Sequence, residues 1–182
     1  HRLRWAGLPP EKYPFHLISS FEHFHFLKPH PAYFAEVMGR LGWPDGPVVM
    51  VGNDVEQDHV PAAALGLATY HALDTSSKND FASSGRGLIS DLRAWLEATD
   101  PASLVPAYTS PTSFLAQLRS TPAVLAGMLD SVPSSAWTRR PAEGEWSATE
   151  ILCHMRDVKR EIDLPRISQI LDEEEPFIPG QN

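Results

Sequence analysis

The chain has 182 residues, the length of one ordinary domain or of two small ones. Its formal net charge of −8 repels phosphate backbones and anionic lipid, so we expect no nucleic-acid partner and no membrane partner. With 42% hydrophobic and 21% charged residues, its composition excludes a disordered chain and predicts a folded globular protein.

Three further features concern the location of the protein. Cys153 is the only cysteine, which excludes an intrachain disulfide and predicts a reducing, cytoplasmic location. The longest uncharged window, residues 101–118, contains three prolines and lacks the apolar continuity of a membrane span. Residues 1–8 do not begin with Met and lack the apolar core of a secretory signal, so we expect a chain that starts within a longer protein.

Short apolar runs alternate with helical periodicity in the first half of the chain. The strands we expect are residues 15–19, 47–51 and 67–71, and the helices we expect are residues 31–41, 60–65 and 87–97. Short units of this kind are typical of a parallel sheet with right-handed crossovers. The first half is therefore predicted to be an α/β domain.

The strand signals end at residues 99–112, where spaced prolines occur without any hydrophobic period. We interpret this stretch as a linker between an α/β domain at residues 1–98 and an all-α domain at residues 113–182. The all-α domain is predicted to begin with a short helix at residues 113–119 and a second helix that starts at residues 121–122.

A strong helix signal follows in the all-α domain. Ser147 and Glu150 have the spacing of a capping box. The positions after them form one apolar face, which consists of Ile151, Leu152, Met155, Val158 and Ile162. Pro165 is expected to kink or end this helix.

Lys28 and the carboxylates after the second predicted strand are the first candidate site. A lysine just before a helix adds a positive charge to free amides, a combination that suits a phosphate. Asp54 and Asp58 follow the strand, and carboxylate oxygens suit Mg²⁺. If the strand ends converge, Lys28 and one of these carboxylates should lie within about 10 Å of each other. The alternative is a solvated loop with a surface lysine.

Four segments resemble the carboxy-terminal half of a haloacid-dehalogenase-like (HAD) hydrolase. They are residues 15–20 (Phe-His-Leu-Ile-Ser-Ser), 28–34 (Lys-Pro-His-Pro-Ala-Tyr-Phe), 49–58 (Val-Met-Val-Gly-Asn-Asp-Val-Glu-Gln-Asp) and 62–69 (Ala-Ala-Ala-Leu-Gly-Leu-Ala-Thr). The resemblance spans residues 3–97 and implies an incomplete Rossmann-like core. It also implies a small phosphorylated substrate.

The same resemblance assigns roles to individual residues. Lys28 matches the catalytic lysine that steadies the nucleophile and the phosphoryl charge, and Asn53, Asp54 and Asp58 stand where the family binds Mg²⁺. The family's Asp-x-Asp nucleophile motif does not occur in these 182 residues and is expected before His1. We therefore expect the chain to be inactive by itself, and its open sheet edge to favour homo-oligomers.

His154 is the second candidate site. Asp157 and Glu161 lie three and seven residues further on, so the three side chains share one helix face and could present metal ligands together. Alternatively, His154 is a residue at the core edge and the two carboxylates pair with Arg156, Lys159 or Arg160. His23, His25 and His30 are interpreted as polar loop residues rather than metal ligands.

Residues 113–180 resemble the start of a DinB-like (YfiT-like) four-helix bundle. The resemblance rests on residues 146–157 (Trp-Ser-Ala-Thr-Glu-Ile-Leu-Cys-His-Met-Arg-Asp), 165–167 (Pro-Arg-Ile) and 175–178 (Glu-Pro-Phe-Ile). It implies that His154 is the first of three histidines that bind Zn²⁺ or Ni²⁺, with the other two expected beyond Asn182. The leading hypothesis is thus a Mg²⁺-dependent phosphohydrolase fragment fused to a partial metal-binding bundle. The alternative is a non-catalytic binding or regulatory module.

Overall fold

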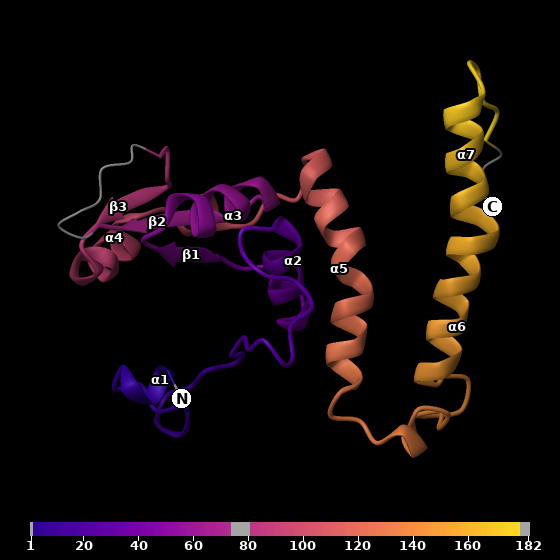
Figure 1. Cartoon of the computed structure of the whole chain (residues 1–182), viewed down its shortest axis with the longest axis horizontal. Helices are drawn as coiled ribbons and strands as arrows, with labels where there is room; N and C mark the ends of the chain where they lie inside the picture. The colour runs from indigo at the N-terminus through magenta and orange to yellow at the C-terminus, as the bar shows by residue number, and fades with distance from the viewer. Residues whose placement is uncertain (1, 74–80, 179–182) are drawn as a thin grey trace. The chain divides into compact units, whose positions relative to one another are not determined.

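The computed structural model describes residues 2–73 and 81–178, and it divides the chain into two compact units, residues 1–129 and 130–182 (Figure 1). The expected linker at residues 99–112 lies inside the first unit. Its backbone is tied to the α/β layer, because the Val48 amide donates to the Leu104 carbonyl (2.9 Å) and the Ala107 amide donates to the Gly66 carbonyl (3.0 Å).

The first unit is built around a three-stranded parallel sheet in the order β1-β2-β3. The strands are β1 (Val49–Gly52), β2 (Ala68–Ala72) and β3 (Gly85–Gly87). In the register, Val49 lies opposite Ala68 and Tyr70 lies opposite Gly85. The predicted parallel sheet is therefore confirmed, as are the two strands expected at residues 47–51 and 67–71.

Residues 15–19 are not a strand, so that prediction is wrong. A strand needs a neighbour for its backbone groups, and among the described residues β1 pairs with β2 alone. The Phe15 amide instead bonds locally to the Tyr13 carbonyl (2.8 Å). The third strand is β3, whose residue Gly85 lies so close to Trp95 that an added Cβ would be 2.3 Å from the ring.

Three helices of the first unit lie close to the positions that the hydrophobic period predicts, namely α2 (Pro31–Arg40), α3 (Val60–Leu65) and α4 (Leu92–Ala98). α1 (Arg2–Trp5) was not predicted, and α5 (Pro111–Leu129) is described below. His30 caps α2, because its Nδ1 accepts a hydrogen bond from the Ala32 amide (3.0 Å). Gly66 ends α3 with a φ of 103°, a conformation that favours glycine. The helix expected at residues 87–97 begins later because β3 and a 3-10 turn come first.

The hydrophobic core lies where α2, α3 and α5 meet the sheet. Its buried members are Phe34, Ala35, Met38, Ala62, Leu65, Leu67 and Ala116. Met50 of β1 packs against this cluster, so the strand that leads to the candidate site is anchored in the core.

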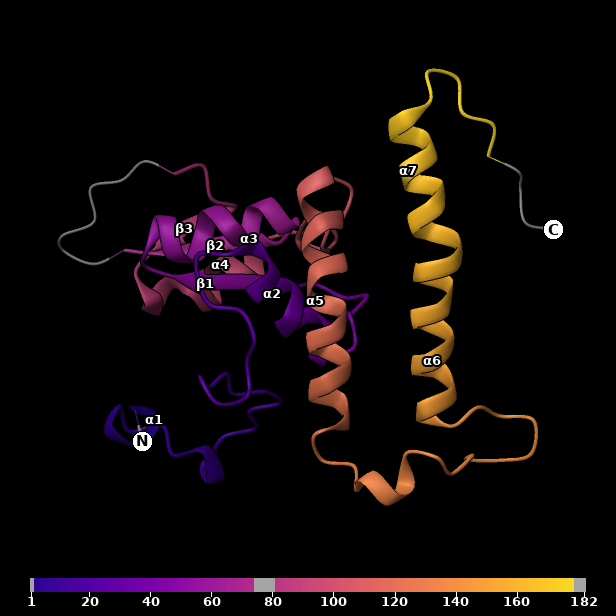
Figure 2. The ribbon, with the colours of Figure 1, turned by 45° about the vertical axis from the view of Figure 1, so that its right-hand side comes forward.

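α5 is one continuous helix, although two helices were expected on either side of residues 121–122. Pro122 lacks an amide proton and normally breaks a helix. Here the Ser120 and Thr121 hydroxyls donate to the Gln117 carbonyl (3.0 and 2.8 Å). The small, buried residues of α5 also pack along α2, which holds the helix together across the proline (Figure 2).

The second unit contains α6 (Ala148–Val158), a π turn (Lys159–Asp163) and α7 (Leu164–Asp172). The predicted capping box is confirmed, because Ser147 Oγ accepts from the Glu150 amide (3.3 Å) and Glu150 accepts from the Ser147 amide (2.8 Å). A hydrogen bond from Arg140, helped by those from the Ser147 amide and hydroxyl, lowers the pKa of Glu150 from 4.5 to about 2. The helical turns do not end near Pro165, which lies in the first turn of α7 directly after the π turn.

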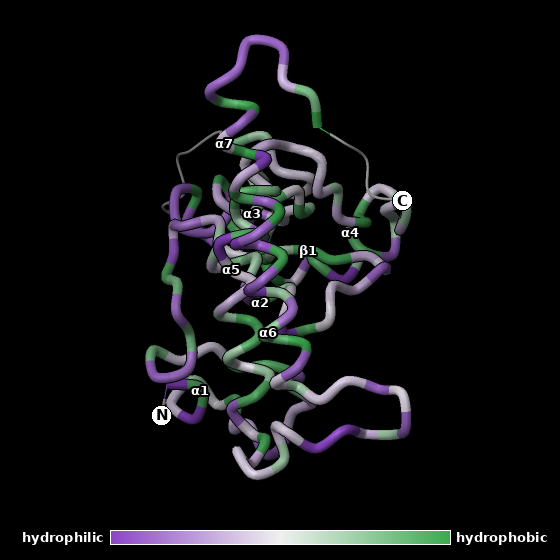
Figure 3. The backbone as a smooth tube through the Cα atoms, turned by 90° about the vertical axis from the view of Figure 1, so that its right-hand side faces the viewer, coloured by the Kyte–Doolittle hydropathy of each residue, from purple (hydrophilic) through white to green (hydrophobic). Residues whose placement is uncertain are grey.

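The apolar face of α6 and α7 is not buried within the second unit. Figure 3 shows hydrophobic positions recurring along α6, and no residue of α6, the π turn or α7 is buried. Ile151 is 43% exposed and Ile167 is 52% exposed.

Among the described residues, no helix is long and apolar enough to cross a membrane.

The close approach of α2 and α5 leads to a stability prediction. An added Cβ at Gly39 would lie 2.4 Å from Val124 Cγ2. We expect Gly39→Ala to lower the free energy of unfolding by about 1–3 kcal/mol, because one helix must shift. Gly46→Ala is the control, since an added Cβ there meets nothing within 4 Å. Urea unfolding checks both variants, and equal stability would contradict this packing.

Candidate functional site

The candidate site joins the loop before α2 to the turn after β1. Lys28 ends the loop, and Asp58 lies in a π turn (Val55–His59) that directly follows the strand. The Lys28 ammonium lies 2.7 Å from Asp58 Oδ1. The expectation that Lys28 approaches one of these carboxylates within about 10 Å is therefore confirmed for Asp58. Asp58 is 7% exposed, whereas the Lys28 side chain is 37% exposed.

The turn after β1 brings Asp58 back against the end of the strand. An added Cβ at Gly52 would lie 2.3 Å from Asp58 Oδ2, so this position has no room for a side chain. Asp54 begins the turn, and its Oδ1 accepts a hydrogen bond from the Gln57 amide (2.9 Å). The Asp54 carboxylate is thus used as a cap, while Asn53 is exposed. Asp58 is the residue of this group that the structure brings to Lys28.

Two aromatic rings lie near the Lys28 ammonium. Its Nζ lies 5.8 Å from the centroid of the Tyr33 ring and 6.0 Å from that of Phe34. Ring faces attract a cation and displace water from it. An ammonium group has three donors, and Asp58 takes one of them. The lysine is therefore a positioned positive charge beside a buried carboxylate.

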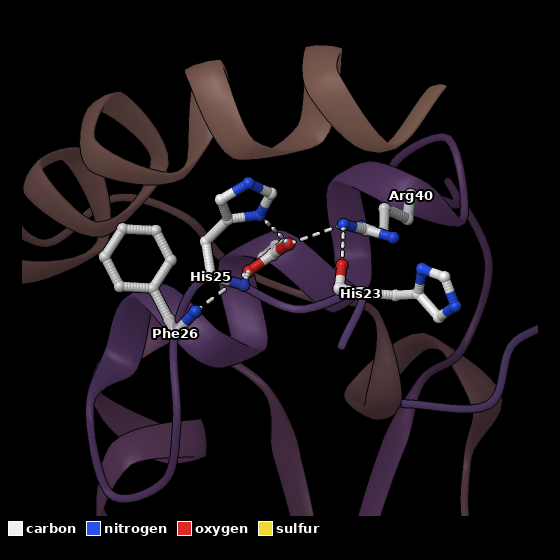
Figure 4. Close-up of polar contacts among 5 residues, drawn as sticks. His23, His25, Phe26 and Arg40 are labelled. Carbon is white, nitrogen blue, oxygen red and sulfur yellow. Dashed lines mark hydrogen bonds and ion pairs between the residues drawn. The ribbon is translucent and has the colours of Figure 1, made fainter. Parts of the chain in front are cut away.

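A buried carboxylate that sequence reasoning missed fixes the loop that leads to Lys28 (Figure 4). Glu36 of α2 is fully buried. Its Oε2 accepts from the His25 amide (3.0 Å) and the Phe26 amide (3.2 Å), and its Oε1 lies 2.8 Å from Arg40 Nη2. Arg40 also donates to the His23 carbonyl, so one ion pair holds both ends of the segment 23–26.

The sequence contains one signal for this arrangement. Glu36 lies on the face of α2 that also contains the buried residues Ala32 and Ala35, and it is followed four residues later by Arg40. A charged residue on an apolar helix face is buried only with partners. The side chains of His25 and His30 contact Glu36 and the α2 amino terminus, which agrees with their interpretation as polar loop residues.

Two buried histidines lie behind the turn and were also missed. His59 and His71 have ring centroids 4.9 Å apart and are 0% and 1% exposed. His59 Nε2 lies 3.0 Å from the Gly52 carbonyl, and His71 Nε2 lies 3.3 Å from the Asn53 carbonyl. Burial lowers the pKa of His59. The neutral ring thus ties the turn to the strand end by donating its Nε2 proton.

The oxygen donors of the turn suit a hard cation. Mg²⁺ is held by one or two carboxylates and keeps several waters. Asp58 supplies one such group, and Asp54 and Asn53 supply oxygen-bearing side chains in the same turn. Within residues 2–73 and 81–178, no three His, Cys, Asp or Glu residues form a metal-binding group. Asp58, Asp54 and Asn53 are the residues of this turn that could hold such a cation.

The surroundings of His154 do not form a metal site within the described part of the chain. His154 is exposed, and its ring contacts the edge of Trp146 at a centroid distance of 4.9 Å. Asp157 pairs with Arg156 (2.7 Å), as the alternative interpretation predicts. One imidazole falls short of the three protein ligands usual in a catalytic zinc site. These residues alone do not fit Zn²⁺ or Ni²⁺.

Comparison of the chain with protein-family models, curated proteins and solved structures found no match. The site must therefore be interpreted from its own geometry. It lies at the carboxyl ends of parallel strands, where open α/β sheets bind their ligands. A lysine beside a carboxylate at this edge can bind a phosphoryl group and a cation.

The buried Glu36 leads to a prediction for the loop. Glu36→Ala is expected to cost about 3–5 kcal/mol of stability, because it leaves the nearly buried Arg40 guanidinium without its counter-charge. Glu36→Gln retains the acceptor oxygen and should cost less. Hydrogen exchange should show faster exchange at the His25 and Phe26 amides in both variants.

The control for Glu36 is Glu97, which forms an exposed ion pair with Arg93 at the same i,i+4 spacing. Glu97→Ala should change stability by only about 0.3–0.5 kcal/mol. Equal effects of Glu36→Ala and Glu97→Ala in urea unfolding would show that the buried carboxylate does not hold the loop.

Proposed function

We propose that Lys28 and Asp58 form the phosphate- and Mg²⁺-binding half of a HAD-type phosphohydrolase site that acts on small phosphorylated molecules. The observation that carries this proposal is the 2.7 Å contact between the Lys28 ammonium and Asp58 Oδ1 at the carboxyl edge of a parallel sheet. It joins two of the four segments on which the resemblance to that family rests, although 30 residues separate Lys28 from Asp58.

Lys28 would hold the negative oxygens of the phosphoryl group. Its charge is effective there because Tyr33 and Phe34 exclude water from one side of the ammonium. Asp58 would hold Mg²⁺, helped by Asp54 or Asn53. The bound cation would neutralise phosphoryl charge as a Lewis acid. Asp58 also orients the lysine, so the same carboxylate would contact both the Lys28 ammonium and Mg²⁺.

The covalent step of this chemistry needs a carboxylate nucleophile. The 182 residues contain no Asp-x-Asp motif. We therefore expect this chain to bind phosphate without hydrolysing a phosphate ester above the buffer rate. Binding, rather than turnover, is the property that tests the proposal.

A non-catalytic binding or regulatory module is the second candidate. It is favoured by the direct pairing of Lys28 with Asp58, which already neutralises the buried carboxylate without a metal. In such a module, the pair Lys28 and Asp58, called the phosphate corner below, would bind an anion at Lys28 and require no cation. Dependence of phosphate binding on Mg²⁺ separates the two functions.

For the second unit we propose a place in a DinB-like helical bundle, in which His154 is one of three metal-binding histidines; no histidine follows it within the 182 residues, so the metal site is incomplete there. Its exposed apolar positions, including Ile151 and Ile167, support this proposal because a helix face of this kind is normally covered in a bundle. The same exposed face suits association between copies of the chain.

Calorimetric titration with inorganic phosphate, with and without Mg²⁺, tests the corner. Lys28→Gln should weaken phosphate binding at least about tenfold through loss of a charge-assisted contact. Asp58→Asn should abolish the effect of Mg²⁺. Circular dichroism and thermal unfolding verify that each variant is folded, and Lys28→Arg retains the charge if Lys28→Gln is unstable.

Lys12→Gln and Asp45→Asn are matched controls, because both residues are exposed and neither lies at the corner. They should bind phosphate and Mg²⁺ as the parent chain does. Unchanged affinity in Lys28→Gln and Asp58→Asn, or the same loss in the controls, would contradict the proposal.

A metal titration tests the second unit. We expect only weak binding of Zn²⁺ or Ni²⁺ by the 182-residue chain, because His154 has too few neighbouring ligands. His154→Ala should bind no more weakly than the control His16→Ala, which alters another exposed histidine. Tight stoichiometric binding that His154→Ala abolishes would refute this expectation.

A further inference from the structure

A cavity of about 390 Å³ opens beside Lys28 in the first unit. Its lining includes Ser20, Phe21, Phe24, Leu27, Lys28 and Tyr33. The lysine that pairs with Asp58 is thus also a wall of this cavity. One ligand could therefore contact Lys28 and the other walls together.

The walls of the cavity are mainly apolar and incompletely buried. Phe21 is 80% exposed and Leu27 is 56% exposed, and both are large enough for their burial to favour ligand binding. Phe24 and Tyr33 are held in place, with ring centroids 5.7 Å apart. The Tyr33 hydroxyl donates to Ser19 Oγ (3.0 Å), which fixes the ring that separates the cavity from the core.

Two polar residues of the lining, Lys28 and Ser20, could orient a ligand in the cavity. Lys28 supplies a cation whose Nζ lies 5.8 Å from the Tyr33 ring centroid, so charge and aromatic wall are neighbours. Ser20 is a second polar residue of the lining.

We propose that this cavity binds the organic part of a phosphate monoester of an aromatic alcohol. The inference rests on the proposed function, since it places the phosphate at Lys28. An aromatic group suits Phe21, Leu27 and Tyr33, and the volume falls in the range usual for small-molecule pockets. A sugar phosphate suits the cavity poorly, because the lining is mainly apolar and several sugar hydroxyls would lose their water without replacement.

Calorimetry on the full 182-residue chain with three probes tests this substrate class. The probes are phenyl phosphate, glycerol 2-phosphate and inorganic phosphate. We expect phenyl phosphate to bind at least about tenfold more tightly than the other two, because only its ring buries apolar surface in the cavity. Phe21→Ala and Leu27→Ala should remove this preference and leave the affinity for inorganic phosphate unchanged.

Phe177→Ala is the matched control, because Phe177 is 78% exposed and lies in the second unit, whereas Phe21 is 80% exposed. Equal binding of phenyl phosphate and inorganic phosphate would overturn the inference and leave the proposed function standing. A preference that survives both cavity variants would also overturn it. Failure of all three probes to bind the parent chain would instead refute the proposed function.

Discussion

The buried carboxylate of Glu36 is the interaction on which the candidate site depends. A carboxylate enters an apolar helix face only if its oxygens find donors there. Glu36 finds them in two loop amides and in Arg40. These bonds tie the segment 23–26 to α2, and Lys28 follows directly on that segment. The position of the catalytic candidate is thus set by a group that touches neither phosphate nor metal.

The Lys28–Asp58 pair differs from the Glu36–Arg40 pair in its access to solvent. Taking an ammonium and a carboxylate out of water costs free energy that their attraction only partly returns. Both carboxylates use both oxygens within the fold, since Asp58 Oδ1 accepts from Lys28 and its Oδ2 accepts from the Asp54 amide (3.4 Å), but only Glu36 is fully buried. Asp58 lies at a strand end where Gly52 leaves room for it, and Lys28 stays partly exposed toward a cavity. Because Lys28 is accessible to solvent and to a ligand, it can exchange its contact with Asp58 for a contact with a bound anion.

The sequence predicts the helices and strands that have a clear hydrophobic pattern. It does not predict those whose formation depends on tertiary contacts. The strands at residues 47–51 and 67–71 are apolar runs bounded by turns, and Pro31 marks the first turn of a helix. The run at residues 15–19 is also mainly apolar, but among the described residues it has no neighbouring strand to pair with. β3 (Gly85–Gly87) has two glycines and no period at all. α5 continues through Pro122 because its small residues pack on α2, a contact that local rules do not contain.

The sequence likewise predicts some residues of the candidate site and misses others. The sequence predicts that Lys28 approaches Asp58 because two strand ends would converge, but residues 15–19 form no strand, and Lys28 reaches Asp58 from a loop that Glu36 holds. The pattern does not predict Glu36 or the pair His59 and His71, because their burial depends on tertiary packing. The cavity residues Phe21 and Leu27 also flank the segment that Glu36 holds. A change at Glu36 should therefore disturb both the phosphate corner and the apolar cavity, which couples ligand selection to the position of the lysine.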